Sequence, residues 1–170
     1  MTVVDLMSEA KMNVELRSKA IEKGRYELYN CFQCMRCTSG CTSMKLLELK
    51  PHQVVTMVKL GLIDELITSG IIWTCAMCLK CTERCPQDAA PSDLITALRN
   101  LAFDMEANVP EAYLKVVSTV LEVGLIQEEQ KVTSRDFEVY DREQLNLPKI
   151  SKPGEIFKNN LLILLTPEED

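Results

Sequence analysis

Four cysteines stand close together in the segment Trp73-Thr-Cys-Ala-Met-Cys-Leu-Lys-Cys-Thr-Glu-Arg-Cys-Pro86. Their spacing is C-x2-C-x2-C-x3-C with proline directly after, which is the pattern that bacterial ferredoxins use to bind [4Fe–4S] clusters. The same spacing occurs once more in the chain. The first run is Cys31, Cys34, Cys37 and Cys41, and the second run is Cys75, Cys78, Cys81 and Cys85. These eight residues are all the cysteines of the 170-residue chain, so every thiol belongs to one of two matched runs.

The spacing also predicts which cysteines share a cluster. In two-cluster proteins with this pattern, the fourth cysteine of each run binds the cluster of the other run. Cluster one is therefore expected to take Cys31, Cys34, Cys37 and Cys85, and cluster two Cys75, Cys78, Cys81 and Cys41. Each cluster would join two segments that are distant in the sequence. Metal binding and folding should then be a single event.

Two other uses of eight cysteines have to be weighed. Two structural zinc sites are an alternative, although zinc usually takes separate C-x2-C pairs. Here the third and fourth cysteines follow the pair at once, in both runs. Disulfides would require an oxidising compartment, and nothing in the sequence indicates export. The pattern favours two [4Fe–4S] clusters.

Composition and charge narrow the classes of function. Hydrophobic residues make up 46% of the chain, which is ordinary for a globular protein. The longest apolar run, Leu161–Leu165, is far too short to cross a membrane, and no signal peptide is recognisable. We therefore expect a cytoplasmic protein. The net charge is −6, and no basic patch exists to neutralise phosphates, so nucleic acid is not an expected partner.

The apolar periodicity predicts a helical protein. We expect helices over residues 5–23, from Pro51 to Gly61, over Asp64–Ser69, over Asp93–Ala107 and from Pro110 to Gly124. Gly24 is the predicted C-cap of the first helix and Ser92 the predicted N-cap of the fourth. His52, the only histidine, is expected to be an ordinary residue of a first helical turn. The fold class predicted is an all-α ferredoxin.

The last segment, residues 126–170, differs from the rest. It carries ten acidic and six basic residues, three prolines and little helical period. One interpretation is a disordered acidic tail, but a tail that serves only solubility needs no large apolar residues. We favour an extended arm for partner contact. The predicted organisation is an N-terminal helix at 1–24, a ferredoxin domain for both clusters at 25–125 and the arm at 126–170.

Several short stretches of the sequence are similar to one known family. They are Glu27-Leu-Tyr-Asn-Cys-Phe-Gln-Cys34, Gly61-Leu-Ile-Asp-Glu-Leu-Ile67, Trp73-Thr-Cys75 and Leu94-Ile-Thr-Ala-Leu-Arg-Asn100. With the two cysteine runs, they resemble the C subunit of heterodisulfide reductase over roughly residues 25–107. The family usually has proline after the fourth cysteine of both runs. This chain departs from that pattern, because Thr42 follows Cys41.

The resemblance implies a role in electron transfer. In that family the C subunit passes electrons through two [4Fe–4S] clusters, between a flavin-containing A subunit and a catalytic B subunit. Related complexes serve coenzyme heterodisulfide reduction in methanogens and sulfur oxidation elsewhere. This chain has neither the Cys-Cys-Gly run of a B subunit nor a G-x-G-x-x-G fingerprint, so no substrate-converting site is expected in it. A zinc-stabilised interaction module and an iron–sulfur redox-sensing regulator remain as alternatives.

Overall fold

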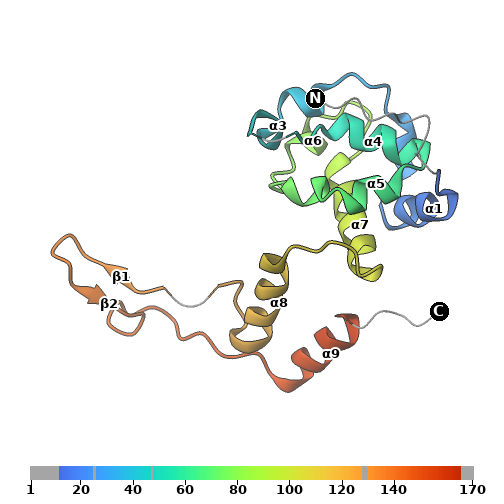
Figure 1. Ribbon diagram of the computed structural model, residues 1–170. Helices are drawn as coiled ribbons and strands as arrows, with labels where there is room; N and C mark the ends of the chain where they lie inside the picture. Colours follow the sequence, from blue (N-terminus) through green and yellow to red (C-terminus); the bar gives the residue numbers. More distant parts are fainter. Residues whose placement is uncertain (1–11, 25, 47, 128–129, 166–170) are drawn as a thin grey trace. The chain divides into compact units, whose positions relative to one another are not determined.

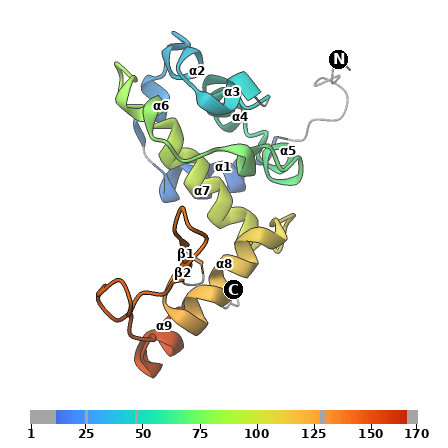
Figure 2. The same cartoon turned by 90° about the vertical axis from the view of Figure 1, so that its left-hand side faces the viewer.

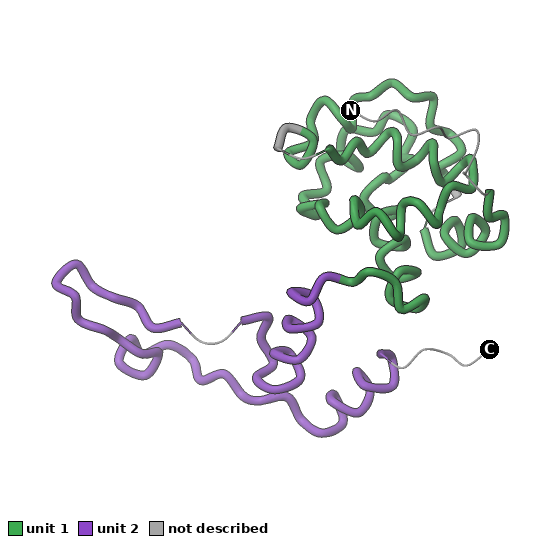
Figure 3. Tube along the Cα trace, viewed as in Figure 1, with its two compact units in different colours: residues 1–109 green, residues 110–170 purple. Residues whose placement is uncertain are grey.

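The computed structural model describes residues 12–24, 26–46, 48–127 and 130–165. The chain divides into two compact units, residues 1–109 and residues 110–170 (Figure 3). The predicted end of the ferredoxin domain is residue 125. The structure instead groups the helix that follows Pro110 with the second unit.

The described part of the first unit consists of helices and loops (Figure 1). Longer helices alternate with single helical turns that carry the cysteine runs. The elements are α1 (Val14–Lys23), η1 (Tyr26–Asn30), α2 (Arg36–Ser39), α3 (Thr42–Leu46), α4 (Pro51–Leu60), α5 (Ile63–Thr68), η2 (Ile71–Thr74), α6 (Lys80–Glu83) and α7 (Pro91–Asp104). The predicted all-α class is confirmed in the coarser form of a mostly helical fold, because one short pair of strands lies in the second unit.

Helix α7 is the centre of the first unit. Helices α1, α4, α5 and α6 and the 3₁₀ turn η2 all pack against it (Figure 2). It contributes Leu94, Ile95 and Leu98 to the core, where they meet Val55 and Val58 of α4. Burying an aliphatic side chain of this size stabilises the fold by about 1.5–3 kcal/mol. One continuous core therefore supports the loops that hold the cysteines.

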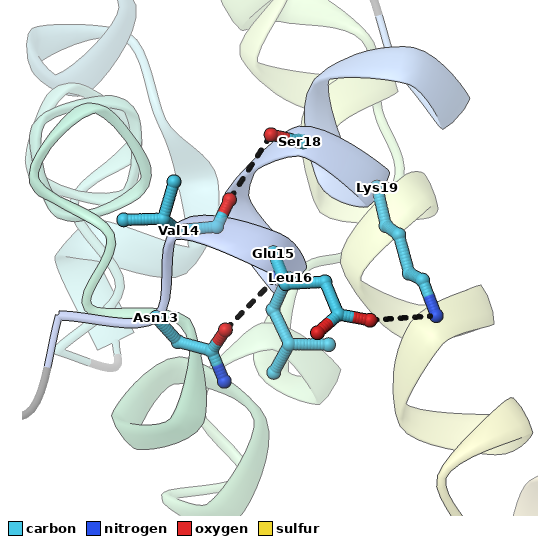
Figure 4. A network of polar contacts seen from close by, with 6 residues as sticks. All are labelled: Asn13, Val14, Glu15, Leu16, Ser18 and Lys19. Carbon is cyan, nitrogen blue, oxygen red and sulfur yellow. Dashed lines mark hydrogen bonds and ion pairs between the residues drawn. The ribbon is translucent and has the colours of Figure 1, made fainter.

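Helix α1 begins at a side-chain cap, which accepts a hydrogen bond from one of the free amides of the first turn. Asn13 is extended at the N-cap, and its Oδ1 accepts a hydrogen bond of 3.0 Å from the Leu16 amide (Figure 4). Asparagine is among the best residues for this position. Figure 4 also shows the exposed ion pair between Lys19 and Glu15. The helix ends at the predicted Gly24 cap, and the predicted residues 5–11 lie outside the described part.

The two long helices that follow the cysteine runs in the sequence, α4 and α7, each begin at a proline. Pro51 is the first residue of α4, as predicted. Helix α7 begins at Pro91, two residues earlier than predicted, so Ser92 is inside the helix and Ala90 is the N-cap. The predicted N-cap role of Ser92 is therefore wrong. Its hydroxyl is instead hydrogen-bonded to the Thr82 hydroxyl, which lies in the second run.

The second unit contains more regular structure than an extended arm. It has α8 (Glu111–Val123), a short antiparallel pair β1 (Val132–Thr133) and β2 (Val139–Tyr140), and α9 (Glu155–Leu165) (Figure 1). The expectation of little helix after residue 126 is wrong, because the apolar run at 161–165 completes α9. None of the helices in the described part of the chain has the length and apolar character of a membrane span.

Candidate iron–sulfur cluster sites

The two cysteine runs share one local backbone conformation. In each run a helical turn, α2 or α6, begins just after the second cysteine. The residues on either side of that cysteine have left-handed backbones: Gln33 and Met35 in the first run, and Met77 and Leu79 in the second. Such φ values cost free energy for residues other than glycine. Because these left-handed residues recur at matched positions, the two loops are expected to have the same function.

Each loop lines a cavity, and each cavity contains one cysteine from the opposite run. Site one is lined by Cys31, Cys34, Cys37 and Cys85, among other residues. Site two is lined by Cys41, Cys75, Cys78 and Cys81, among other residues. These are the same two groups of four cysteines that the spacing assigns to the two clusters.

The two runs also pack directly on each other. Helical turns α2 and α6 are in contact, and the Arg84 guanidinium lies over Gly40. A Cβ at Gly40 would come within 2.6 Å of Arg84 Nη1, closer than atoms can approach. The fourth cysteine of each run follows directly after one of these two residues, Cys41 after Gly40 and Cys85 after Arg84. Close packing here is what lets each fourth cysteine reach the other site.

Burial and hydrogen bonding divide the thiols into two kinds. The third cysteine of each run is buried, and this burial raises the pKa of Cys37 and of Cys81. Hydrogen bonds offset part of this effect, from Thr38 to Cys37 and from Ser92 to Cys81. A metal must therefore displace the proton from these two thiols, since the thiolate is the ligand form.

The pKa of Cys78 is shifted in the opposite direction to those of Cys37 and Cys81. Cys78 is exposed, and its pKa is lowered, first by a hydrogen bond from the Lys80 backbone and then by one from the Thr42 side chain. Two donors thus favour the thiolate form at this position before any metal arrives. In site one, amide donors reach the sulfurs instead: Gln33 Nε2 lies 3.3 Å from Cys31 Sγ, and the Ala89 amide lies 3.2 Å from Cys85 Sγ.

His52 has a larger role than the sequence predicted. It lines site one, and its Nδ1 is hydrogen-bonded at 2.6 Å to the hydroxyl of Thr38, the residue that follows Cys37 in the sequence. The Thr82–Ser92 bond occupies the matching place in the second run. The signal was present in the sequence, because a threonine follows the third cysteine in both runs. Each threonine pairs with the residue after a helix-starting proline.

Arg99 is a second residue whose role the sequence did not reveal. It is only 9% exposed, and its guanidinium donates to two backbone carbonyl groups. Nε and Nη2 lie 3.1 and 2.9 Å from the Ile72 oxygen, and Nη2 lies 2.8 Å from the Cys75 oxygen. The cation also lies over the Trp73 ring, 5.2 Å from its centroid. Arg99 therefore ties the loop that begins the second run to helix α7.

The cysteine arrangement suits a cluster better than a single ion. Among the described residues, no three His, Cys, Asp or Glu side chains are gathered closely enough to hold one metal ion. Structural zinc requires four ligands that all lie about 2.0–2.3 Å from one atom. In this chain four cysteines line each of the two sites. A four-iron cluster takes one thiolate on each iron, so each site has the number of thiolates that such a cluster needs.

Comparison with known proteins identifies the family. The 4Fe-4S dicluster domain matches residues 27–89, which include both cysteine runs. An iron-sulfur C subunit of the CoB–CoM heterodisulfide reductase of Methanocaldococcus jannaschii is 34% identical over 131 residues, which are 77% of this chain and 67% of that protein. This chain belongs to the family of heterodisulfide reductase C subunits.

Other members of the family support the assignment. The C subunit of the H₂:CoB–CoM heterodisulfide,ferredoxin reductase of Methanothermobacter thermautotrophicus is 30% identical over 71% of this chain and 64% of its own length. The iron-sulfur C subunit of the CoB–CoM heterodisulfide reductase of Methanopyrus kandleri is 34% identical over 55% of this chain and 48% of its own length. The chain thus spans between about half and two thirds of these relatives. The resemblance seen in the sequence and the prediction of an iron–sulfur protein are confirmed.

Proposed function

We propose that this chain is an electron-transfer subunit of a heterodisulfide reductase-like complex and holds two [4Fe–4S] clusters. Cluster one is held by the cysteines of site one, and cluster two by those of site two. The observation that supports this proposal is the lining of the two cavities, each by three cysteines of one run and one of the other. The shared fourth cysteines keep the clusters near each other, as electron transfer between them requires.

The clusters and the polypeptide contribute different parts of the proposed function. The clusters supply one-electron redox chemistry, and the chain supplies thiolates, hydrogen bonds to sulfur and a packed core behind them. We assign no substrate conversion to this chain. Its electron partners are a flavin-containing A-type subunit and a catalytic B-type subunit, and we place the complex in the cytoplasm, where cysteines stay reduced.

Metal analysis tests the proposal directly. We expect the anaerobically purified chain to contain about eight iron atoms and about eight acid-labile sulfides, because each cluster contributes four of each. Zinc should be absent at stoichiometric level. One or two zinc ions with little iron would instead support a zinc-stabilised interaction module. Clusters that disassemble under mild oxidation and release a bound effector would support a redox-sensing regulator.

The part of the second unit that follows Gly124 is the proposed partner-contact segment. Helix α9 has no buried residue, although it is rich in apolar side chains. Phe137 is 88% exposed and Leu164 80% exposed. Exposed apolar surface of this kind typically marks an interaction site. We propose that the segment gains its contacts on a partner within the complex.

Truncation separates the two proposed roles of the chain. Removing residues 125–170 should leave iron content and cluster spectra unchanged, because the cysteines and the core around α7 all lie in the first unit. Recovery of the complex by co-purification with the A- and B-type subunits should fall at least about tenfold, since losing apolar anchors costs more than about 1.4 kcal/mol.

Point variants refine the truncation experiment. Phe157→Ser should weaken co-purification, whereas Lys149→Ala should not, because its ion pair with Glu143 is exposed to solvent. Equal recovery of complex from the full-length and truncated chains would make this segment a solvated extension. Loss of clusters on truncation would place it within the cluster-binding domain.

A further inference from the structure

The residue that follows the fourth cysteine differs between the two runs. Pro86 follows Cys85, whereas Thr42 follows Cys41. Proline has neither a side-chain donor nor a backbone N–H, so this position can donate no hydrogen bond in the second run. Threonine at the matching position of the first run carries a hydroxyl group that can donate. Thr42 and Pro86 therefore show the same position of the two runs with and without a hydrogen-bond donor.

The Thr42 hydroxyl lies beside a cysteine of the other run. Its Oγ1 is 3.7 Å from Cys78 Sγ, within the range for a hydrogen bond to sulfur. Thr42 is the first residue of α3 and follows Cys41, which lines site two together with Cys78. A thiolate bound to iron has no proton to give. The hydroxyl must then be the donor and the Cys78 sulfur the acceptor.

We propose that Thr42 is a positioning residue that raises the reduction potential of cluster two through its hydrogen bond to Cys78. The inference rests on the proposed function, because it requires a cluster in site two. Reduction adds one negative charge to the cluster, and part of it is carried by the cysteine sulfurs. A donor aimed at one sulfur stabilises the reduced form more than the oxidised form, and hydrogen bonds to sulfur are a known control of cluster potential.

The effect should be confined to one of the two clusters. Site one has its own donors to sulfur, Gln33 Nε2 and the Ala89 amide, and neither involves Thr42. Cys78 and Thr42 both lie outside the lining of site one. Thr42 is also exposed, so substituting it removes no part of the core. A change at this residue should move one potential and leave the other where it was.

The experiment is a redox titration of the full-length chain with both clusters loaded, followed by electron paramagnetic resonance. Thr42→Val is the decisive variant, because it replaces the hydroxyl by a methyl group of similar size, which cannot donate a hydrogen bond. We expect the midpoint potential of cluster two to shift downward and that of cluster one to stay unchanged. Thr42→Ser, which keeps the hydroxyl, should stay close to the unsubstituted protein.

Two further variants complete the test. Thr68→Val makes the same chemical change where the hydroxyl donates to the Asp64 carbonyl, and it should shift neither potential. Cys78→Ser identifies which signal belongs to cluster two. The proposal is overturned if Thr42→Val leaves both potentials unchanged, if it moves cluster one, or if Thr42→Ser shifts cluster two as far as Thr42→Val does. Iron and sulfide content, measured on every variant, shows separately whether two clusters are bound.

Discussion

Replacing Cys85 by serine is expected to damage cluster one, although Cys85 belongs to the second run. The reason is the crossed lining of the two sites: Cys85 borders site one with the first three cysteines of the other run. The exchange replaces a thiolate ligand by a poorer oxygen ligand. We expect loss of up to about half of the bound iron, or a three-iron cluster in site one, because each iron of a [4Fe–4S] cluster depends on its own thiolate. Cluster two should keep its spectrum.

The crossed ligand set can be tested without assigning either spectrum in advance. The paramagnetic resonance spectrum of Cys85→Ser should match that of Cys34→Ser, a variant of the first run, and differ from that of Cys78→Ser. Likewise, Cys41→Ser should match Cys78→Ser, because both residues line site two. If Cys85→Ser instead resembles Cys78→Ser, each run holds its own cluster and the crossed arrangement is wrong.

Replacing Arg99 by methionine is expected to destabilise the first unit strongly. The change removes three hydrogen bonds at 2.8–3.1 Å and leaves the Ile72 and Cys75 carbonyl groups without these donors. Each buried polar group that loses its partner costs about 1–3 kcal/mol, so the free energy of unfolding should fall by about 3 kcal/mol. Since the loop begins the second run, cluster two should be lost before cluster one.

The measurement is the midpoint of unfolding in denaturant under anaerobic conditions, with the loss of each cluster followed by visible absorbance and by paramagnetic resonance. Arg17→Met is the matched control, because Arg17 makes one long bond of 3.5 Å to the Lys59 carbonyl and is partly exposed. Its effect should stay below about 1 kcal/mol. Arg99→Lys should recover only part of the loss, since an ammonium group cannot reproduce the planar fork of the guanidinium. Equal stability of Arg99→Met and Arg17→Met would contradict the proposed role.

Local rules in the sequence determined most of the framework around the sites. The doubled cysteine spacing implied two matched loops, and Pro51 and Gly61 marked the ends of α4 where the structure has them. Gly124 likewise ends α8 with a left-handed backbone. These features depend on neighbours a few residues apart, on fixed proline φ and on the freedom of glycine at positive φ. A single sequence is enough to recognise such short-range constraints.

The tertiary structure decided which side chains surround the sulfurs. The Thr42–Cys78, Thr38–His52 and Arg99–Cys75 contacts join residues 36, 14 and 24 positions apart. No local pattern specifies them, because they arise only when segments that are distant in the sequence fold against one another. Helix α9 was missed for a related reason: its apolar residues run almost all around the helix, so they give no one-sided period to detect. The spacing of the cysteines sets the type of cluster expected, and the fold decides which donors each cluster meets.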